Sequence, residues 1–94
     1  MRIIWTKTSE LTLDEILNYI ESEFGKLISE KYFSEVIKTV EKIGIQPEMF
    51  PIYHKDTEVR KAVIKKKSIL YYKISEDTIC LLAFYDVRMN IHKL

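Results

Sequence analysis

The feature that most constrains the fold is a run of three β-type segments in the last third of the chain, from Val59 to Arg88. Successive side chains of a strand point to opposite faces, so the middle segment, residues 69–74, divides into two sets. One face receives Leu70, Tyr72 and Ile74, and the other receives Ile69, Tyr71 and Lys73. We expect the first face to lie against the core of the protein and the second to lie opposite it.

The segments on either side complete a three-stranded meander. Residues 78–85 form a β-branched and aromatic run that is apolar on both faces, which is typical of a strand inside a sheet. Residues 59–64 supply the other strand, and the basic stretch 65–68 connects it to the middle one. Residues 75–77 are polar and have the length of a hairpin loop. The last third of the chain therefore predicts a small sheet with a basic connection at one end.

Two amphipathic helices are predicted before these strands, because apolar residues recur at helical spacing in two stretches. The first stripe consists of Leu13, Ile16, Leu17, Ile20 and Phe24, and the second consists of Phe33, Val36, Ile37, Val40 and Ile43. A short link through residues 26–28 favours an antiparallel hairpin, whose apolar stripes bury each other and one face of the sheet.

Polar residues and a glycine indicate the boundaries of these helices. The first helix begins either at a capping box formed by Thr12 and Glu15 or one turn earlier at Ser9. Gly25 is expected to end it, because glycine takes the left-handed conformation at little steric cost. Ser29 is the candidate cap of the second helix.

The remaining segments complete the predicted topology. A β-type run at residues 3–5 precedes the first helix, and residues 44–57, which contain both prolines, follow the second helix as a loop. The order strand, helix, helix, strand, strand, strand predicts an α+β fold, with an antiparallel helical hairpin on one face of a mostly antiparallel four-stranded sheet. With 94 residues, the chain is expected to form a single domain spanning residues 1–94.

Composition is typical of an ordinary soluble globular protein, and the N-terminal segment is expected to be the first strand of a cytoplasmic one. The residues are 47% hydrophobic and 31% charged, with two Gly and two Pro, which argues against disordered and fibrous classes. No stretch is long enough to span a membrane, and the N-terminus lacks the apolar run of a signal peptide. We expect no membrane partner. The lone Cys80 is expected to be a small buried hydrophobe, because it lies in an apolar strand.

The two halves of the chain differ in charge. Residues 1–51 carry six Lys and Arg against nine Asp and Glu, whereas residues 52–94 carry nine against five. The basic half contains the predicted meander. A basic edge of a sheet indicates a polyanionic or acidic partner.

Motifs for nucleotide, zinc and serine-hydrolase chemistry are absent from the sequence. It contains no Gly-rich phosphate loop, no His-x-x-x-His pair, no paired Cys and no Gly-x-Ser-x-Gly elbow, so no cofactor or metal is expected. The two histidines are His54, in the predicted loop, and His92, four residues after Arg88. A guanidinium that holds a phosphate beside an imidazole can support cleavage of RNA by attack of its own 2′-hydroxyl. Arg88 is the stronger candidate, because it ends a buried strand and is held by a rigid element.

Five segments, taken in order, resemble the RelE/ParE superfamily of bacterial toxins. They are Ile4-Trp5, residues 13–20 (LDEILNYI), Val59-Arg60, residues 70–74 (LYYKI) and residues 84–90 (FYDVRMN). The resemblance covers essentially the whole chain, and the long helical hairpin is more similar to the ParE branch. It implies a toxin of a type II toxin–antitoxin system, whose partner antitoxin wraps the toxin with an extended or helical acidic segment.

Two positions depart from the pattern of the superfamily. Members often carry an arginine where this chain has Ile69, and the ribosome-dependent RNases use it to hold phosphate; the tail commonly has a proline where this chain has Ile91. The matching residues that remain are Arg88 and the adjacent tail. The resemblance therefore favours a toxin that inhibits DNA gyrase, which needs no catalytic residue. The alternatives are an mRNA interferase that acts on the ribosome with Arg88 and His92 as catalytic residues, and an inactive member that only binds antitoxin.

The expected partner-binding surface lies mainly on the face of the sheet opposite the core. Ile69 and Tyr71 form an apolar patch between lysines on that face, provided that no other element covers them. The predicted set, which includes the basic residues nearby, is Ile69, Tyr71, Lys73, Arg60, Lys65, Lys66 and Lys67.

Overall fold

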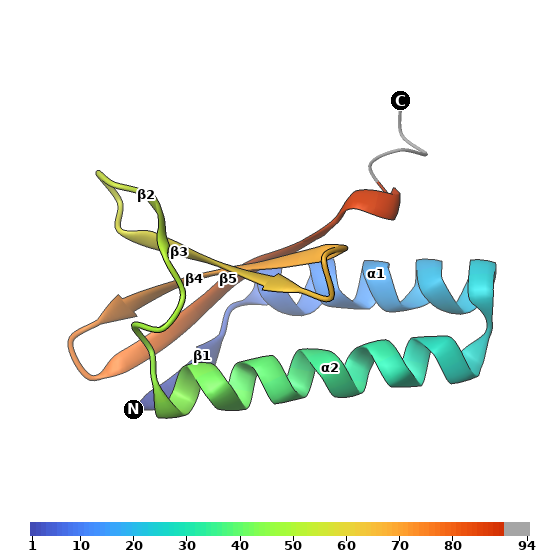
Figure 1. Ribbon diagram of the computed structural model, residues 1–94, viewed down its shortest axis with the longest axis horizontal. Coiled ribbons are helices and arrows are strands. Elements are labelled where there is room, and N and C mark those ends of the chain that lie inside the picture. Colours follow the sequence, from blue (N-terminus) through green and yellow to red (C-terminus); the bar gives the residue numbers. More distant parts are fainter. Residues whose placement is uncertain (90–94) are drawn as a thin grey trace.

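A helical hairpin and a mixed sheet form the two layers of the structure. The computed structural model describes residues 1–89. Its elements are β1 (Arg2–Trp5), α1 (Lys7–Phe24), α2 (Lys26–Ile45), β2 (Ile52–His54), β3 (Val59–Ile64), β4 (Ser68–Ser75) and β5 (Thr78–Asp86). The two helices run antiparallel along one face of the sheet and leave the other face uncovered (Figure 1). The predicted α+β class and the helical hairpin on one face are confirmed.

The sheet has five strands, and the prediction of four was wrong. Their order is β1-β5-β4-β3-β2, with β1 parallel to β5 and the other pairs antiparallel. The additional strand, β2, lies in the segment that was predicted as a loop. Its three residues are all exposed and its pairing with β3 is irregular, so it shows no alternation of apolar and polar side chains.

α1 begins earlier than the sequence predicts. It starts at Lys7, and the hydroxyl oxygen of its N-cap, Thr6, accepts a hydrogen bond from the amide of Ser9 at 3.1 Å. Both predicted starts, Ser9 and Thr12, lie inside the helix and were wrong. The Thr6 hydroxyl also donates to the carbonyl of Leu81 in β5 at 2.7 Å. A contact with a strand that is distant in the sequence therefore helps to fix the start of the helix.

A single residue, Gly25, connects α1 and α2. Its φ of 96° and ψ of 167° belong to a region that only glycine occupies readily, which confirms Gly25 as the end of α1. The predicted link, residues 26–28, instead forms the first turn of α2. Ser29 is not a cap either, because it is buried within α2 and donates a hydrogen bond to the carbonyl of Leu17 at 3.2 Å. This contact joins the two helices near their connected ends.

The helices and the sheet share one apolar core. Its buried residues are Leu13, Ile16 and Ile20 from α1, Tyr32, Val36, Val40 and Ile43 from α2, and Ala62, Ile64, Leu70, Tyr72, Ile79, Leu81 and Phe84 from the strands. Leu70 and Tyr72 thus face the core as predicted. Phe24 and Phe33 were expected on the buried stripes but are 52% and 42% exposed. Phe24 lies in the last turn of α1, and Tyr32 takes the stripe position that Phe33 was expected to fill.

A β-bulge in β5 changes which of its residues face the core. Consecutive residues of β4 pair with Ala83 and Leu81, so Leu82 is an extra residue in β5. Buried side chains alternate as far as Leu81 and then resume at Phe84 and Asp86. The bulge turns Tyr85 outward and Asp86 inward.

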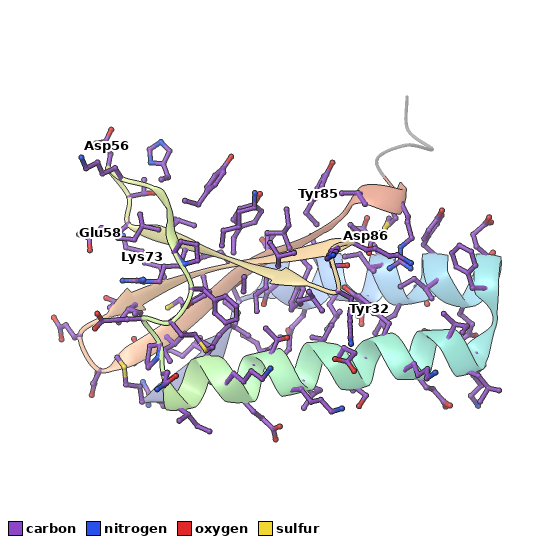
Figure 2. All side chains as sticks on the ribbon, in the orientation of Figure 1. Tyr32, Asp56, Glu58, Lys73, Tyr85 and Asp86 are labelled. Atoms are coloured by element: carbon purple, nitrogen blue, oxygen red, sulfur yellow. The ribbon has the colours of Figure 1, made fainter. Side chains whose placement is uncertain are left out.

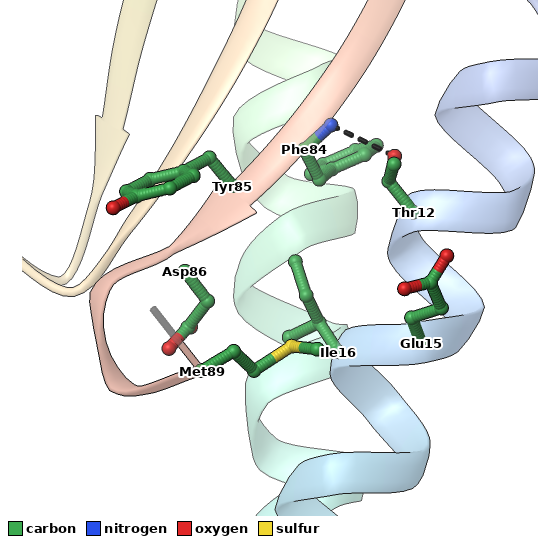
Figure 3. A pocket seen from close by; sticks show the side chains of 7 residues that line it. All are labelled: Thr12, Glu15, Ile16, Phe84, Tyr85, Asp86 and Met89. Carbon is green, nitrogen blue, oxygen red and sulfur yellow. Dashed lines mark hydrogen bonds between the residues drawn. The ribbon is translucent and has the colours of Figure 1, made fainter. Parts of the chain in front are cut away.

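Two threonines from α1 and its cap hold this bulge. The Thr6 hydroxyl, which donates to the carbonyl of Leu81, also lies 3.2 Å from the carbonyl of Leu82. The amide of Phe84 donates to the hydroxyl of Thr12 at 2.9 Å (Figure 3). Backbone groups that the interrupted ladder would leave unpaired are therefore satisfied by side chains. The orientation of the last residues of β5 depends on these contacts with α1.

The turn between β3 and β4 carries two lysines in a conformation that most side chains disfavour. The φ angle is 52° at Lys65 and 62° at Lys66, and the amide of Lys67 donates to the carbonyl of Ile64 at 3.1 Å. Successive positive φ angles are typical of hairpin turns in which glycine and asparagine are preferred. A left-handed conformation costs other residues about 1–2 kcal/mol each. The turn is therefore a strained part of the fold.

Replacing Lys66 with glycine should stabilise the protein, because glycine adopts a positive φ without strain. We expect Lys66→Gly to raise the free energy of unfolding by about 1 kcal/mol, measured by urea denaturation. The matched control is Lys67→Gly, at a neighbouring position without a positive φ, which should be neutral or destabilising. Equal changes in the two variants would contradict the strain that we assign to the turn.

Candidate functional site

A buried carboxylate lies at the end of β5, where the sheet passes over α2. Asp86 is turned toward the helices by the bulge and is 2% exposed. It pairs across the ladder with Ser68, whose hydroxyl donates a hydrogen bond to Asp86 Oδ2. The next amide, that of Val87, donates to the carbonyl of Lys67 at 2.9 Å. These bonds fix the end of β5 to the β3–β4 turn.

The same carboxylate holds Arg88. The amide and Nε of Arg88 donate to Asp86 Oδ1 at 3.0 and 2.9 Å, and Nη2 donates to Oδ2 at 2.7 Å. The guanidinium also lies 6.0 Å from the ring centre of Phe24 and 5.8 Å from that of Tyr32, within range of cation–π attraction. Only 20% of the Arg88 side chain is exposed. The bidentate pair leaves Nη1 as the end of the guanidinium that points away from Asp86.

Hydrogen bonding and burial set the protonation states at this place. Burial raises the pKa of the Asp86 carboxyl, but hydrogen bonds from Arg88 and Ser68 outweigh burial and lower this pKa below its usual value. The hydrogen bonds to Asp86 raise the pKa of Arg88. Burial raises the pKa of the Tyr32 phenol to about 12, and the nearby Ser68 hydroxyl opposes this shift. The buried Tyr32 hydroxyl has no hydrogen-bond partner within residues 1–89.

A cleft of about 420 Å³ opens beside Arg88, between α2 and the β3–β4 turn. It is lined by Ile28, Lys31, Tyr32, Glu35, Ile64, Lys65, Lys67 and Arg88. Figure 2 shows Tyr32 rising from α2 toward Asp86 at the end of β5. The Glu35 carboxylate lies 3.8 Å from Lys65 Nζ and 3.7 Å from Lys38 Nζ. Because four basic side chains line the cleft with a single acidic one, the cleft is electropositive.

The uncovered side of the sheet carries an apolar patch with lysines at its border. This surface, called the outer face below, includes Lys61, Val63, Ile69, Tyr71, Lys73, Cys80 and Tyr85, which are neighbours across β3, β4 and β5. Tyr85 points away from the helices (Figure 2). The ring of Tyr53 from β2 lies 5.2 Å from that of Tyr71 and covers part of it. Cys80 is only partly buried, so the expectation of a buried cysteine was wrong.

Arg60 does not contribute to the outer face. It lies opposite Tyr72, on the side of the sheet that faces the helices. Its Nη1 donates to the carbonyls of Glu48 and Phe50 at 3.2 and 2.7 Å. Arg60 therefore holds the segment that follows α2 against the sheet.

Comparisons with known proteins identify the family of this fold. The family model described as the ParE toxin of type II toxin–antitoxin system, parDE, matches residues 3–91. The chain belongs to the ParE toxin family. A solved structure titled "Chromosomal ParDE TA system from P. aeruginosa" resembles this ParE-family chain with a TM-score of 0.70 and 17% identity, over 92% of this chain and 95% of that one. At this identity the likeness shows the shared fold. The predicted membership of the RelE/ParE superfamily, in its ParE branch, is confirmed.

No curated protein matches the chain. Within residues 1–89, no helix is long and apolar enough to cross a membrane. In the same part of the chain, no three His, Cys, Asp or Glu side chains gather where they could hold a metal ion.

The structure of this ParE-family chain places six of the predicted site residues on two separate surfaces. Arg88, Lys65 and Lys67 meet at the cleft, whereas Lys66 is exposed in the turn and does not line it. Ile69, like Tyr71 and Lys73, lies on the outer face. The position where the superfamily's RNases often carry an arginine is therefore on the opposite side of β4 from Arg88.

Neither histidine is placed beside Arg88 in the described structure. His92 lies outside the described residues. His54 is exposed at the end of β2, with its Nδ1 3.1 Å from the Thr57 hydroxyl, and it does not line the cleft.

Four residues at the site were not expected from the sequence. Lys31, Tyr32 and Glu35 come from α2, and Asp86 ends β5. The spacing of Asp86 and Arg88 contained a usable signal, because an aspartate side chain can accept a hydrogen bond from the backbone amide two residues later. Lys31 and Glu35 in α2 gave a weaker signal. A pair of opposite charges one helical turn apart is also typical of a helix surface that is exposed to solvent.

Asp86→Asn should destabilise the protein in a pH-dependent manner. The pKa of Asp86 is lower in the folded than in the unfolded state, so its ionised form stabilises the fold above about pH 4. This contribution is lost as the pH falls through the folded-state pKa. We expect the variant to lose about 2–3 kcal/mol of unfolding free energy at neutral pH, because Arg88 is left unpaired, and to approach the parent protein in acid.

Urea denaturation at neutral and acidic pH measures this difference. Asp77→Asn, at an exposed turn position, is the matched control and should change stability little at either pH. A loss for Asp86→Asn that does not vary with pH would contradict the role that we assign to its charge.

Proposed function

We propose that this ParE-family toxin acts in the cytoplasm by inhibiting DNA gyrase and that a cognate antitoxin neutralises it. The observation that favours gyrase binding over RNA cleavage is the engagement of Arg88 by Asp86. A guanidinium that already forms a bidentate pair with a buried carboxylate offers a phosphate one donor end instead of a fork. Arg88 is therefore better arranged to hold the end of the sheet than to clamp a scissile phosphate.

The composition of the cleft supports the same choice. Cleavage of RNA through its 2′-hydroxyl requires a base, an acid and groups that offset charge on the phosphate. No imidazole lines the cleft within residues 1–89, and Tyr32, with a pKa of about 12, is not deprotonated at neutral pH. The arginine that the superfamily's RNases often carry is replaced by Ile69. These features favour a toxin that acts by binding.

One observation supports an mRNA interferase as the second candidate. Glu35 lines the cleft close to Lys65, and a carboxylate beside a phosphate site can act as a general base. Its contacts with Lys38 and Lys65 engage the carboxylate in the structure and count against this role. An inactive member that only binds antitoxin would need the same fold and outer face.

The outer face is the proposed antitoxin surface. Ile69 and Tyr71 are half-buried there, between Lys61 and Lys73. An apolar patch with cations at its border suits a partner segment that combines apolar and acidic residues. We propose that Tyr71 is an anchor of this interface, because aromatic residues often contribute strongly to binding.

Tyr71→Asp should weaken antitoxin binding by at least about 1 kcal/mol, because it places a carboxylate where acidic residues approach and removes an apolar contact. Calorimetric titration with the antitoxin encoded beside the toxin measures the effect, and thermal unfolding verifies the fold. Ile45→Asp, at an exposed apolar position on α2, is the matched control and should bind as the parent does. Unchanged affinity for Tyr71→Asp would remove the outer face from the interface.

Expression without antitoxin should stop DNA replication and leave messenger RNA intact, because we propose gyrase as the target. A supercoiling assay with purified gyrase and mapping of transcript ends on ribosomes should be run in parallel. Glu35→Gln should retain the inhibition of supercoiling, since a binding inhibitor needs no general base.

The interferase alternative predicts a different pattern. It requires cuts positioned by codons, loss of those cuts in Glu35→Gln and in Arg88→Ala, and unaffected supercoiling. The glutamate variant is the more decisive of the two, because Arg88→Ala also leaves the buried Asp86 unpaired and lowers stability. That pattern would replace gyrase inhibition with RNA cleavage as the function.

A further inference from the structure

We propose that the cleft between α2 and the β3–β4 turn receives acidic side chains of the antitoxin. The inference rests on the proposed function, because it assumes that an antitoxin binds this chain. The cleft would be a second contact region for the antitoxin, in addition to the outer face. The two surfaces are separate, since Arg88 and Tyr32 line the cleft on the helix side of the sheet and Tyr71 lies on the other side.

The charges in the cleft are only partly balanced. Arg88 and Lys65 are paired with carboxylates of the same chain, at 2.7 and 3.8 Å. Lys31 and Lys67 line the cleft with them and make no ion pair within residues 1–89. Two cations in one cleft that lack a counter-charge attract an anion, and Arg88 lines the same cleft with its Nη1 outside the bidentate pair. The cleft is therefore complementary to one or two carboxylates.

The walls of the cleft favour a protein side chain over a nucleic acid. Ile28 and Ile64 line it beside the cations and can contact the methylene groups of a glutamate or a neighbouring apolar residue. Nucleic acids are bound by stripes of cations that follow successive phosphates and by aromatic platforms that stack on bases. Here Glu35 lies among the cations, and the aromatic ring that lines the cleft, Tyr32, is almost fully buried. An acidic segment of a protein fits these walls better.

The strained turn is consistent with a binding role for its lysines. Lys65 holds a φ of 52°, where asparagine or glycine would be less strained. Strained backbone conformations cluster at functional sites, where a particular side chain must occupy the position. The turn places Lys65 and Lys67 at the wall of the cleft. A turn optimised for stability alone would not carry lysine at position 65.

The cleft and the outer face adjoin at one end of the sheet. Val63, Ile69 and Tyr85 pair with one another across three strands and form the last row of the outer face before the β3–β4 turn. Residues 65–67 follow directly, and two of them line the cleft on the helix side. A single partner segment on the outer face can therefore pass around this end of the sheet and bring acidic residues to Lys31 and Lys67.

A titration with a defined peptide tests the proposal without the antitoxin. The probe is a short peptide in which glutamate and leucine alternate, added to the isotope-labelled full chain. We expect the amide resonances of Lys31 and Lys67 to shift on binding and the affinity to fall as salt is added. The variant with both Lys31→Gln and Lys67→Gln should bind about tenfold more weakly, a change of about 1.4 kcal/mol.

Matched controls define the outcomes that would overturn the proposal. Lys42→Gln combined with Lys55→Gln removes the same charge at exposed positions outside the cleft and should bind as the parent does. Equal weakening in the two double variants would mean unspecific charge attraction. Equal binding of a peptide with glutamine in place of glutamate would mean that carboxylates are not recognised. Tighter binding of a single-stranded RNA of similar length at Lys31 and Lys67 would assign the cleft to a nucleic acid.

This proposal and the proposed function can fail separately. If the peptide does not bind the cleft but Tyr71→Asp still weakens the antitoxin complex, the cleft contact is wrong and the toxin assignment stands. If the peptide binds the cleft through Lys31 and Lys67 but no antitoxin neutralises the protein, recognition of carboxylates stands and the assignment to an antitoxin falls.

Discussion

The structure depends on the hydrogen bonds that hold β5 at its bulge, where pairing with β4 is interrupted. Leu82 is an extra residue, and Thr6 and Thr12 supply the hydrogen bonds that the neighbouring backbone groups lack. In a regular strand, the alternation that buries Leu81 would carry Tyr85 toward the core and Asp86 to the outer face. The bulge reverses both. The carboxylate that holds the end of the sheet is therefore inside because the first turns of α1 accommodate an irregular strand.

The fold class was predictable because it follows from hydrophobic periodicity, which is a local property of the sequence. The helical stripes around Ile16 and Val40 and the alternation around Tyr72 indicate their elements without further information. The start of α1 was not predictable, because Thr6 is selected over later caps by contacts with β5. The strand at residues 3–5 was predicted, but its parallel pairing with the last strand was not, because that contact is distant in the sequence. β2 was missed because its exposed residues carry no pattern.

About half of the candidate site could be inferred from the sequence. Arg88 was identifiable because it follows a buried strand, and the turn lysines were identifiable as a basic connection. Lys31 and its neighbours in α2 were not, because a charged helical face gives no sign of whether it borders solvent or a cleft until the rotation of the helix against the sheet is known. Arg60 was predicted as a partner-binding residue because it is a basic residue of a strand. Its register opposite Tyr72 instead places it on the helix side of the sheet.

The single cysteine gives the outer face a chemical reporter. Cys80 is partly buried on this face, opposite Lys73 in β4, and the chain contains no other thiol. Thiol-directed reagents react only with cysteines that they can reach. A macromolecule that lies across the sheet would slow alkylation of Cys80, whereas one that contacts only the helices would leave the rate unchanged. The native chain can therefore report from which side a target approaches, without an introduced label.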